Sequence, residues 1–344
     1  MFVEEKCTVC GECVQKCFYL AYDEEKAKTE FKKLIDGEPT PITTDCITCA
    51  ACNEICPEGA NPFDLINARQ EETDTFGNKG SAQMMAGVKL MPSSVVKGDP
   101  GKPVMSLCTV DMIPGVVEGK LFEGLTVIKG GDYFCQIGWV HAGKPSMVKK
   151  NAQIFVDNVA KVVPKGGDFI CYHDDCYCMI KHFLKEYEID VPFNAIHIIE
   201  YMRDYVKEHP DQVKKLNIKI AYQEPCASRY TFHETDSILD ELFELIGVER
   251  VTRKYDRGTA LCCGGVVAGM EALSREEKDR GWKANLADAK EAGAEAMIML
   301  CPLCNLYLRS KAYAQGMEPY MLVNLVRSAL GETLTHGGAG KIYN

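Results

Sequence analysis

CTVCGECVQKC occupies residues 7–17 and CITCAACNEICP occupies residues 46–57, and these two stretches decide the fold of the amino-terminal part of the chain. Each has three cysteines at intervals of three residues and a fourth cysteine four residues later. Three thiolates at this spacing surround one face of an iron–sulfur cube, and a helical step carries the fourth away to a second cube. The stretches therefore predict two [4Fe–4S] clusters with crossed ligands. The first ligand set is Cys7, Cys10, Cys13 and Cys56, and the second is Cys46, Cys49, Cys52 and Cys17.

Zinc is the main alternative for these cysteines, because Zn²⁺ also binds Cys-x2-Cys pairs. Eight cysteines in two four-cysteine runs fit two cubes better than zinc sites. Pro57 follows the second run, whereas Phe18 replaces the proline after the first run and leaves its ligands intact. Residues 18–45 are longer than the connection in a minimal ferredoxin. This part of the chain resembles the helical two-cluster domains of multi-subunit oxidoreductases.

Composition places the chain among globular proteins of two or three domains, with 344 residues, 46% of them hydrophobic. Its 18 cysteines stand at short spacings, which favours metal binding over disulfides. No secretory signal precedes the first motif, and no apolar run approaches the ~20 residues that span a bilayer. We expect a cytoplasmic protein that could sit on a membrane through a partner subunit. The net charge of −10 argues against nucleic acid as a partner.

Residues 106–210 and 215–335 are expected to be two copies of one α/β unit, joined to the amino-terminal domain (residues 1–75) by a linker over residues 76–105. Residues 134–135 and 173–176 each lie 128 positions before residues 262–263 and 301–304, without a gap. A repeat of this length indicates an internal duplication.

Local patterns place strands and helices in both copies. Strands are expected at residues 168–172, 218–222 and 296–300, and helices at about 146–163 and 236–246. Ser274 and Glu277 form a capping box for a further helix. Alternation of strands and helices predicts parallel pairing, so the fold class of the whole chain is expected to be α+β.

The second copy carries five cysteines around a central adjacent pair. Two adjacent cysteines cannot easily bind one iron of a compact cube, but they can hold two irons of a larger, opened cluster. Gly264 and Gly265 follow the pair and allow backbone N–H groups to approach cluster sulfur atoms. The five cysteines are Cys226, Cys262, Cys263, Cys301 and Cys304.

This pattern resembles the CCG domain of the heterodisulfide reductase B/D family, which also occurs in iron–sulfur subunits of glycolate, lactate and glycerol-3-phosphate oxidising complexes. The resemblance covers nearly the whole chain, because the D-type subunit fuses a two-cluster ferredoxin domain to two CCG units. It implies that the five cysteines of the second copy hold a noncubane [4Fe–4S] cluster and form the catalytic site. The alternative is zinc or an empty site, because some CCG domains differ in what they bind.

The first copy departs from the CCG pattern. Phe134 replaces the first cysteine of the pair, Gln136 and Ile137 replace the two glycines, and His173 replaces a further cysteine. The thiols could form a substrate pocket, or they could be small buried hydrophobes at a vestigial site. A third interpretation is an altered cluster or another metal. Its ligands would be Cys108, Cys135, Cys176 and either His173 or Cys171.

The resemblance implies an iron–sulfur electron-transfer subunit of a heterodisulfide-reductase-like oxidoreductase complex. Two cubanes would pass electrons to the noncubane cluster, which could reduce a disulfide. Because the first CCG motif is incomplete, the alternative is a relay subunit of a flavoprotein dehydrogenase complex that delivers electrons to a quinone or another acceptor. No glycine-rich dinucleotide fingerprint follows a strand, so we expect a flavoprotein or cytochrome-type partner subunit.

Overall fold

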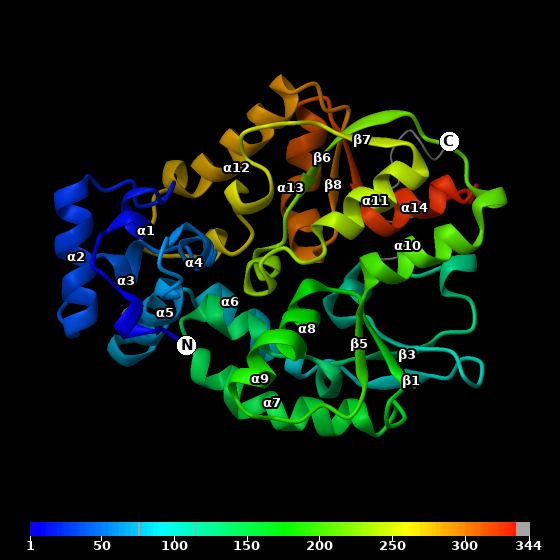
Figure 1. Cartoon of the computed structure of the whole chain (residues 1–344), viewed down its shortest axis with the longest axis horizontal. Helices are drawn as coiled ribbons and strands as arrows, with labels where there is room; N and C mark the ends of the chain where they lie inside the picture. The colour runs from blue at the N-terminus through cyan, green and yellow to red at the C-terminus, as the bar shows by residue number, and fades with distance from the viewer. Residues whose placement is uncertain (75, 114, 335–344) are drawn as a thin grey trace.

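The structure, a computed structural model, describes residues 1–74, 76–113 and 115–334. Figure 1 shows the amino-terminal helices at one end of the molecule and two α/β units, one above the other, at the opposite end. Helices and largely parallel sheets together confirm the α+β class. Within the described residues, no helix combines the length and the apolar character needed to cross a membrane.

The amino-terminal part is helical, and its own small core holds its helices together. Phe31, Leu34 and Ile66 are fully buried in this core. The Asp23 carboxylate accepts a hydrogen bond from Lys26 N (2.8 Å) at the start of the longest helix, and Gly37 ends that helix in the left-handed region. The helices are α1 (Glu12–Gln15), α2 (Glu24–Asp36), α3 (Ile42–Asp45), α4 (Ala51–Ile55) and α5 (Pro62–Thr73).

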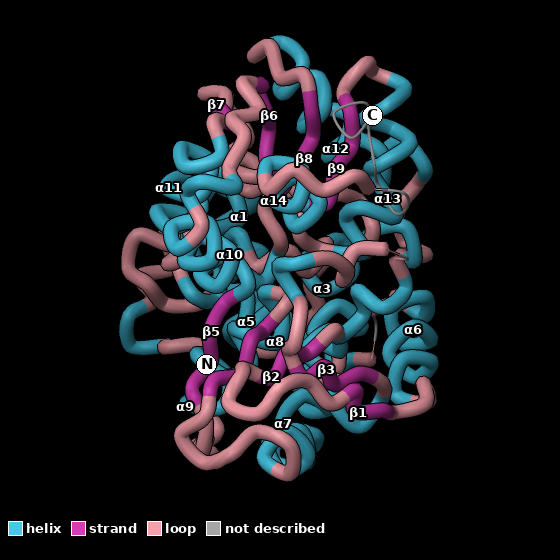
Figure 2. The backbone as a smooth tube through the Cα atoms, turned by 90° about the vertical axis from the view of Figure 1, so that its right-hand side faces the viewer, coloured by secondary structure: helices cyan, strands magenta, loops and turns pink. Residues whose placement is uncertain are grey.

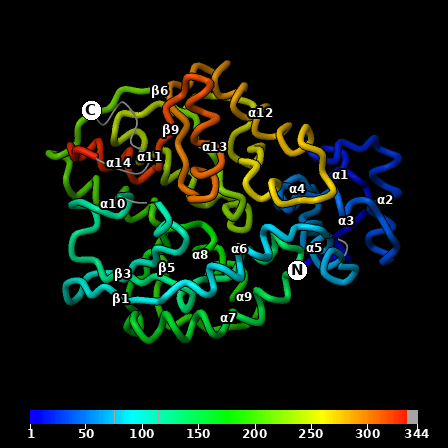
Figure 3. The backbone as a smooth tube through the Cα atoms, turned by 180° about the vertical axis from the view of Figure 1, so that it is seen from behind, coloured from blue at the N-terminus to red at the C-terminus, as the bar shows by residue number. Residues whose placement is uncertain are grey.

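Residues 76–105, which were expected to be a linker, are structured. They contain α6 (Lys79–Lys89), β1 (Ser94–Val96) and most of β2 (Val104–Ser106). Met85 and Val88 on α6 are buried in the core of the first unit. The strands depend on partners far along the chain, so the Gly- and Pro-rich composition does not reveal them. Figure 3 shows α6 beside the end of the amino-terminal helices.

The first unit contains a five-stranded sheet with the order β1-β3-β2-β4-β5, counted within the described residues. β1 pairs with β3 in the antiparallel sense, and the other pairs are parallel. The remaining strands are β3 (Thr126–Lys129), β4 (Asp168–Cys171) and β5 (Asn194–His197). The helices are α7 (Pro145–Ala160), α8 (Asp174–Cys178), a π-helical turn (Met179–Phe183), α9 (Leu184–Glu186) and α10 (Ile198–Glu208).

The second unit contains a parallel four-stranded sheet, again among the described residues, with the order β7-β6-β8-β9. The capping box of Ser274 and Glu277 is present at the start of α12, as expected. The strands are β6 (Ile218–Gln223), β7 (Val248–Arg250), β8 (Ala296–Met299) and β9 (Glu318–Met321). The helices are α11 (Asp236–Ile246), α12 (Arg275–Glu291), α13 (Pro302–Ala314) and α14 (Leu322–Ala329).

The two sheets share one topology. The parallel order β3-β2-β4-β5 of the first matches the order β7-β6-β8-β9 of the second, strand for strand. Figure 2 shows the two groups of strands at opposite ends of the view. In both units, the segments that follow the two central strands carry cysteine or histidine: Cys108 after β2, His173 after β4, Cys226 after β6 and Cys301 after β8. Ligands of parallel sheets bind at these carboxyl ends.

One hydrophobic core joins the two units. Met105 and Tyr172 from the first unit belong to the same buried cluster as Ile220, Tyr222 and Ile298 from the second. Helices α10 and α11 also pack against each other across the boundary. The two sheets are therefore held at a fixed distance by a common core.

Leu242 on α11 tests this shared core, because its side chain is fully buried there. Leu242→Ala should lower the free energy of unfolding by about 2–5 kcal/mol. Trp139 lies in the first unit and Trp282 in the second, so single-tryptophan variants can follow each unit in an anaerobic denaturant titration. Both tryptophans should report the same unfolding transition, and Leu242→Ala should shift that transition equally for both. Leu306→Ala, at a side chain that is 54% exposed, is the control. Two separate transitions would contradict a common core.

Candidate metal centres

The two three-cysteine turns of the amino-terminal part have the same unusual backbone. Val9 (φ 54°) and Gly11 (φ 77°) in the first turn correspond to Thr48 (φ 59°) and Ala50 (φ 59°) in the second. Non-glycine residues rarely adopt this left-handed region, and such strain is concentrated at ligand sites. The conformation turns successive cysteines toward a common centre.

The eight cysteines of this part form two groups, and each group includes one cysteine from the other run. Cys56 lines a small cavity together with Cys7, Cys10 and Cys13. Cys17 neighbours Cys49 and Cys46, and Cys52 lies among them. All eighteen cysteines lie in the described residues, and all are free.

Electrostatics in these groups suit a bound iron–sulfur cluster. Burial, reinforced by the neighbouring Cys49 thiolate, raises the pKa of Cys17 to about 11. Converging thiols that raise one another's pKa values are held deprotonated only by positive charge at their centre. Backbone N–H groups of Thr48 and Ala60 donate to Cys46 Sγ and Cys56 Sγ, both at 3.4 Å, which also favours the thiolate form.

The five cysteines of the second unit form one continuous group. Cys226 contacts Cys262, the adjacent pair contact each other, Cys263 contacts Cys304, and Cys304 contacts Cys301. Hydrogen bonding from Cys262 lowers the pKa of Cys263 to about 6, and hydrogen bonding from Cys304 does the same for Cys301. Hydrogen bonding within the group therefore favours the thiolate forms of Cys263 and Cys301.

The glycine pair beside these cysteines has a clear steric and electrostatic role. Gly264 N donates to Cys262 Sγ (3.3 Å), and Gly265 N donates to Cys263 Sγ (3.4 Å). Gly264 has φ +92°, and a Cβ there would lie 2.6 Å from the Tyr307 ring. Side chains at this position would push the N–H donors away from the thiolates. These donors and the five convergent thiols fit an iron–sulfur cluster.

Tyr19 joins the amino-terminal part to this group, and the sequence motifs do not reveal it. Its hydroxyl accepts a hydrogen bond from Cys262 N (2.9 Å). Arg280 on α12 donates to the carbonyl oxygens of Phe18 (2.7 Å) and Tyr19 (2.6 Å). A Cβ at Gly281 would lie 2.5 Å from the Tyr19 hydroxyl. A glycine inside a helical pattern is therefore the one sequence signal for this close contact.

Arg229 is the second connection, and it is almost fully buried. It donates to Glu54 Oε2 (3.0 Å), to the carbonyl oxygen of Cys49 (3.2 Å) and to that of Ala260 (2.6 Å). Its positive charge acts on both Cys49 and Cys226. The group of Cys17, Cys46, Cys49 and Cys52 thus lies next to the five-cysteine group.

An ionic network surrounds Arg229. Ring and carboxylate atoms of Glu224, His233 and Asp236 lie within 4.8 Å of one another, as metal ligands would. However, Arg250 already neutralises Glu224 (Nη2–Oε1 2.5 Å), and His233 contacts Glu54 (Nε2–Oε1 2.5 Å). The network is an ion-pair bridge between α4 and the second unit.

His233 makes this bridge sensitive to pH. Burial opposes its protonation, but Glu224 and Glu54 outweigh burial and raise its pKa to about 9. The folded-state pKa therefore exceeds the unfolded value of about 6.5. The resulting stability is fully present below about pH 6.5 and is lost as the pH rises through about 9.

Denaturant titrations from about pH 7 to pH 10 measure the free energy of unfolding at each pH. This free energy should fall more steeply with pH in the wild type than in His233→Gln, because glutamine cannot lose a proton. Identical slopes in the two proteins would contradict a charged His233 in the folded state.

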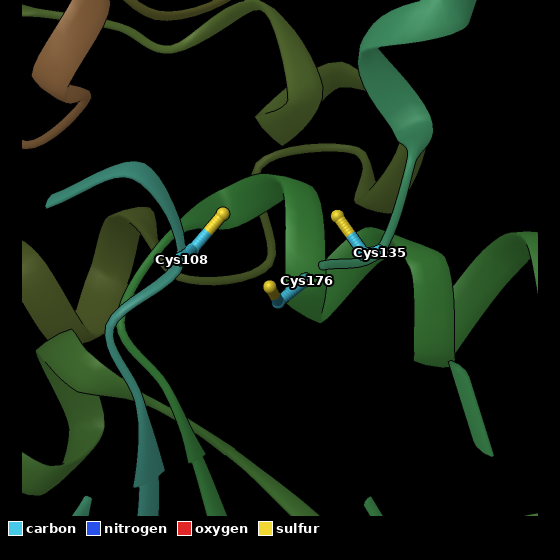
Figure 4. A group of neighbouring side chains, drawn as sticks. All are labelled: Cys108, Cys135 and Cys176. Atoms are coloured by element: carbon cyan, nitrogen blue, oxygen red, sulfur yellow. The ribbon is translucent and has the colours of Figure 1, made fainter. Parts of the chain in front are cut away.

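In the first unit, the structure brings together three of the candidate cysteines. The sulfur atoms of Cys108, Cys135 and Cys176 point toward a common space (Figure 4) and lie within 4.8 Å of one another. His173 lies within hydrogen-bonding reach of both Cys108 and Cys301, so it stands between the two units. Cys171 lies at the end of β4 and is not part of this group of sulfur atoms.

The altered motif keeps the backbone of the complete one. Gln136, at the position of Gly264, has φ +66°, compared with +92° for the glycine. Phe134, at the position of Cys262, is buried in the core of its unit. At this position the two loops thus share a left-handed residue, although the neighbouring ligand residues differ.

Comparison with known proteins identifies a domain family and two relatives. Residues 220–309 match the CCG cysteine-rich domain family. The chain is 22% identical to the D subunit of dihydromethanophenazine:CoB–CoM heterodisulfide reductase from Methanosarcina acetivorans, over 95% of this chain and 94% of the relative. It is 21% identical to the B subunit of fumarate reductase (CoM/CoB) from Methanothermobacter marburgensis, over 93% of this chain and 70% of the relative.

A solved structure shows a similar fold. The crystal structure of a hypothetical protein from Helicobacter pylori matches 84% of this chain with a TM-score of 0.56 and 13% identity, and the chain spans 64% of the length of that protein. This likeness concerns the fold alone. Together with the two curated relatives, the domain match identifies the chain as one that carries a CCG cysteine-rich domain and is similar, along nearly its whole length, to the D subunit of heterodisulfide reductase.

Proposed function

We propose that this chain is the iron–sulfur electron-transfer subunit of a heterodisulfide-reductase-like oxidoreductase complex, and that its second CCG unit reduces a disulfide. The observation that carries the proposal is that two cysteine groups lie next to each other and share two bridging side chains. Tyr19 and Arg229 link the group that contains Cys17 and Cys49 to the group that contains Cys226 and Cys262. The similarity to one component of a heterodisulfide reductase over 95% of the chain supports the same function.

We propose a separate role for each domain of the chain. Residues 1–75 would hold two cubane clusters, and residues 215–335 would hold a noncubane cluster, with residue 335 outside the described part. Residues 106–210 would form the degenerate CCG unit. When bound, the clusters would supply one-electron transfer at low potential.

The positions of the cysteine groups support an order for the proposed electron path. The group of Cys7, Cys10, Cys13 and Cys56 lines a cavity that also includes the exposed Thr8 and Glu58, so it is the group proposed to receive electrons from a donor subunit. The other amino-terminal group lies next to the five-cysteine group, so it is the proposed intermediate site. A flavoprotein or cytochrome-type subunit would supply the electrons, which the chain passes inward.

At the five-cysteine group, reduction must deliver two electrons and two protons to break one S–S bond and give two thiols. The N–H groups of Gly264 and Gly265 stabilise negative charge on Cys262 and Cys263. Burial of both cysteines excludes water from these sulfur atoms. These residues therefore hold a thiolate-rich, water-poor site in a form suited to sulfur exchange.

The incomplete first unit supports a second candidate function. With Phe134 and His173 at cysteine positions, the chain offers only one complete CCG motif. The alternative is a relay subunit of a flavoprotein dehydrogenase complex of the glycolate, lactate or glycerol-3-phosphate type, which would deliver electrons to a quinone.

Reoxidation of the reduced protein distinguishes the two functions. The anaerobic, dithionite-reduced chain should be reoxidised by an aliphatic disulfide, with two thiols formed for every two electrons lost. Cys263→Ser should abolish this reaction while the cubane signals in electron paramagnetic resonance persist. Cys178→Ser, at a buried cysteine outside the group, is the control and should react normally. Reoxidation by a soluble quinone but not by the disulfide would favour the relay function.

Arg229 provides a test of the proposed path. Removing a buried positive charge disfavours an added electron, so Arg229→Gln should lower the midpoint potential of the intermediate site by tens of mV, roughly the scale of a tenfold change in an equilibrium constant. Arg229→Lys keeps the charge and should shift it less. Arg309→Gln, at an exposed position on α13, is the control. An unchanged midpoint potential in Arg229→Gln would mean that the intermediate site and the five-cysteine group lie farther apart than proposed.

A further inference from the structure

A cavity of about 410 Å³ lies between the amino-terminal helices and the second unit. Small-molecule sites in proteins have volumes of roughly 300–1,000 Å³, so this cavity is large enough for a ligand. Residues 16–19 and part of α4 form one wall, and residues 254–261 form the other. Helix α4 packs against the turn Arg257–Thr259, and Figure 3 shows these two segments side by side.

The cavity adjoins one cysteine group and no other. Cys17 and Cys49 of the proposed intermediate site line it, whereas Cys46 and Cys52 of the same group do not. The cavity therefore lies beside the four sulfur atoms and not among them. The five cysteines of the second unit are also absent from its lining. A molecule in the cavity would thus exchange electrons with the intermediate site, because it would lie against two of the proposed cluster ligands.

Aromatic rings form the sides of the cavity. Phe18 and Tyr255 come from opposite walls, and their ring centroids are 5.7 Å apart with an angle of 78° between the ring planes. Below them, Ala260 and Leu261 are buried and give the cavity an apolar floor. Aromatic side chains contact other flat rings favourably, through both their faces and their edges. This lining therefore suits a planar aromatic ligand.

The mouth of the cavity is positively charged. Lys16 and Lys254 are exposed there, and no aspartate or glutamate of the described chain lines the cavity, although the chain has a net charge of −10. Lys16 is paired with Glu12. Lys254 makes no ion pair within the described residues, and its Nζ lies 4.9 Å from the centroid of the Tyr255 ring. Its free ammonium group suits an anionic substituent on the ligand.

The wall that carries Lys254 and Tyr255 is held rigidly. The Asp288 carboxylate accepts hydrogen bonds from Lys254 N (3.2 Å) and Tyr255 N (2.8 Å). Thr259 Oγ1 donates to the carbonyl oxygen of Lys254 (2.6 Å). On the opposite wall, the Arg280 guanidinium lies 5.1 Å from the centroid of the Phe18 ring. Groups that are already fixed lose little freedom when a ligand binds, which favours affinity.

We propose that this cavity binds a planar aromatic electron carrier with an anionic substituent, of the quinone class, and that the intermediate site reduces it. The ring packs against Phe18 and Tyr255, and the anionic group pairs with Lys254. The quinone takes two electrons from the reduced site, one at a time, and two protons from water at the mouth, and becomes the hydroquinone. The donor subunit replaces the electrons. The inference rests on the proposed cubane at the intermediate site, and it is independent of disulfide reduction by the second unit.

Binding of anthraquinone sulfonate to the full, cluster-loaded chain tests the site. Anaerobic equilibrium dialysis with the oxidised protein should show saturable binding of one molecule per chain. Gly258→Leu fills the cavity, and the backbone tolerates it, because a Cβ at Gly258 meets only Glu54 Oε2, at 3.8 Å. Binding should weaken by about tenfold or more, as expected when a packed site is overfilled. Gly87→Leu is the control, because a Cβ at Gly87 on α6 meets no atom within 4 Å. Absent binding, or equal binding to Gly258→Leu, would overturn the proposal.

A matched pair of ligands tests the role of Lys254. Lys254→Gln should weaken binding of anthraquinone sulfonate by up to about fivefold, the scale of an exposed ion pair. Lys254→Arg should bind like the wild type. A hydroxymethyl anthraquinone, which has the same rings without the charge, should bind equally to all three proteins. Lys290→Gln, at an exposed lysine on α12, is the control. Equal losses for the charged and the neutral ligand would contradict the pairing with Lys254.

Reoxidation of the reduced chain tests the electron transfer. After excess dithionite is removed, anthraquinone sulfonate should reoxidise the wild type and give one hydroquinone for every two electrons lost. Gly258→Leu should slow this reaction as much as it weakens binding, while its cubane signals and its reaction with an aliphatic disulfide persist. A bound quinone that stays oxidised beside reduced cubanes would overturn the inference. A wild type that reduces the quinone but no disulfide would support this site and count against the proposed function of the second unit.

Discussion

Mutual repulsion among buried thiolates is the constraint on which the rest of this structure depends. Burial disfavours the charged form of each sulfur atom, and each neighbouring thiolate disfavours it further. The chain nevertheless gathers its cysteines at common centres, so each group requires positive charge and hydrogen-bond donors around it. Backbone N–H groups at Thr48, Gly264 and Gly265 supply donors, and Arg229 supplies charge between two groups.

The constraint explains why the cysteine groups lie at the carboxyl ends of parallel strands. Loops that leave such strands can bring residues from β2 and β4, or from β6 and β8, to one point. Because the second sheet repeats the topology of the first, the duplication produced two such points. Their candidate ligands differ, while Gln136 and Gly264 share the left-handed conformation. His173 and Cys301 bring the two points into contact.

Docking of the amino-terminal helices depends on buried polar contacts as well as on packing. Arg229 and Arg280 each donate to carbonyl oxygens of this part of the chain. The guanidinium of Arg229 is buried, and burying it without these partners would be costly. Gly281 lets α12 approach Tyr19 closely. The same contacts that hold the parts together therefore also set the distance between the cysteine groups.

The sequence by itself determined the features that depend on local spacing. The spacing of the two four-cysteine runs predicts their crossed ligand sets, and the CCG pattern predicts five ligands for a further cluster; both ligand assignments stay predictions. The bounds of α11 and the capping box of α12 were also readable, because helix formation and capping depend on neighbours within one or two turns. The constant offset between residues 134 and 262 revealed the duplication that the two sheets share.

Only the tertiary structure decided how these pieces meet. β1 and β2 lie in a segment whose composition indicated a linker, because their pairing partners are remote in sequence. The sequence left open whether Cys171 or His173 lies beside Cys108. These residues are two positions apart around the end of β4, and only the fold fixes the direction in which each side chain points. Arg229 and Tyr19 carry no motif at all. Their roles arise from contacts across more than a hundred residues, where spacing carries no information and packing alone decides.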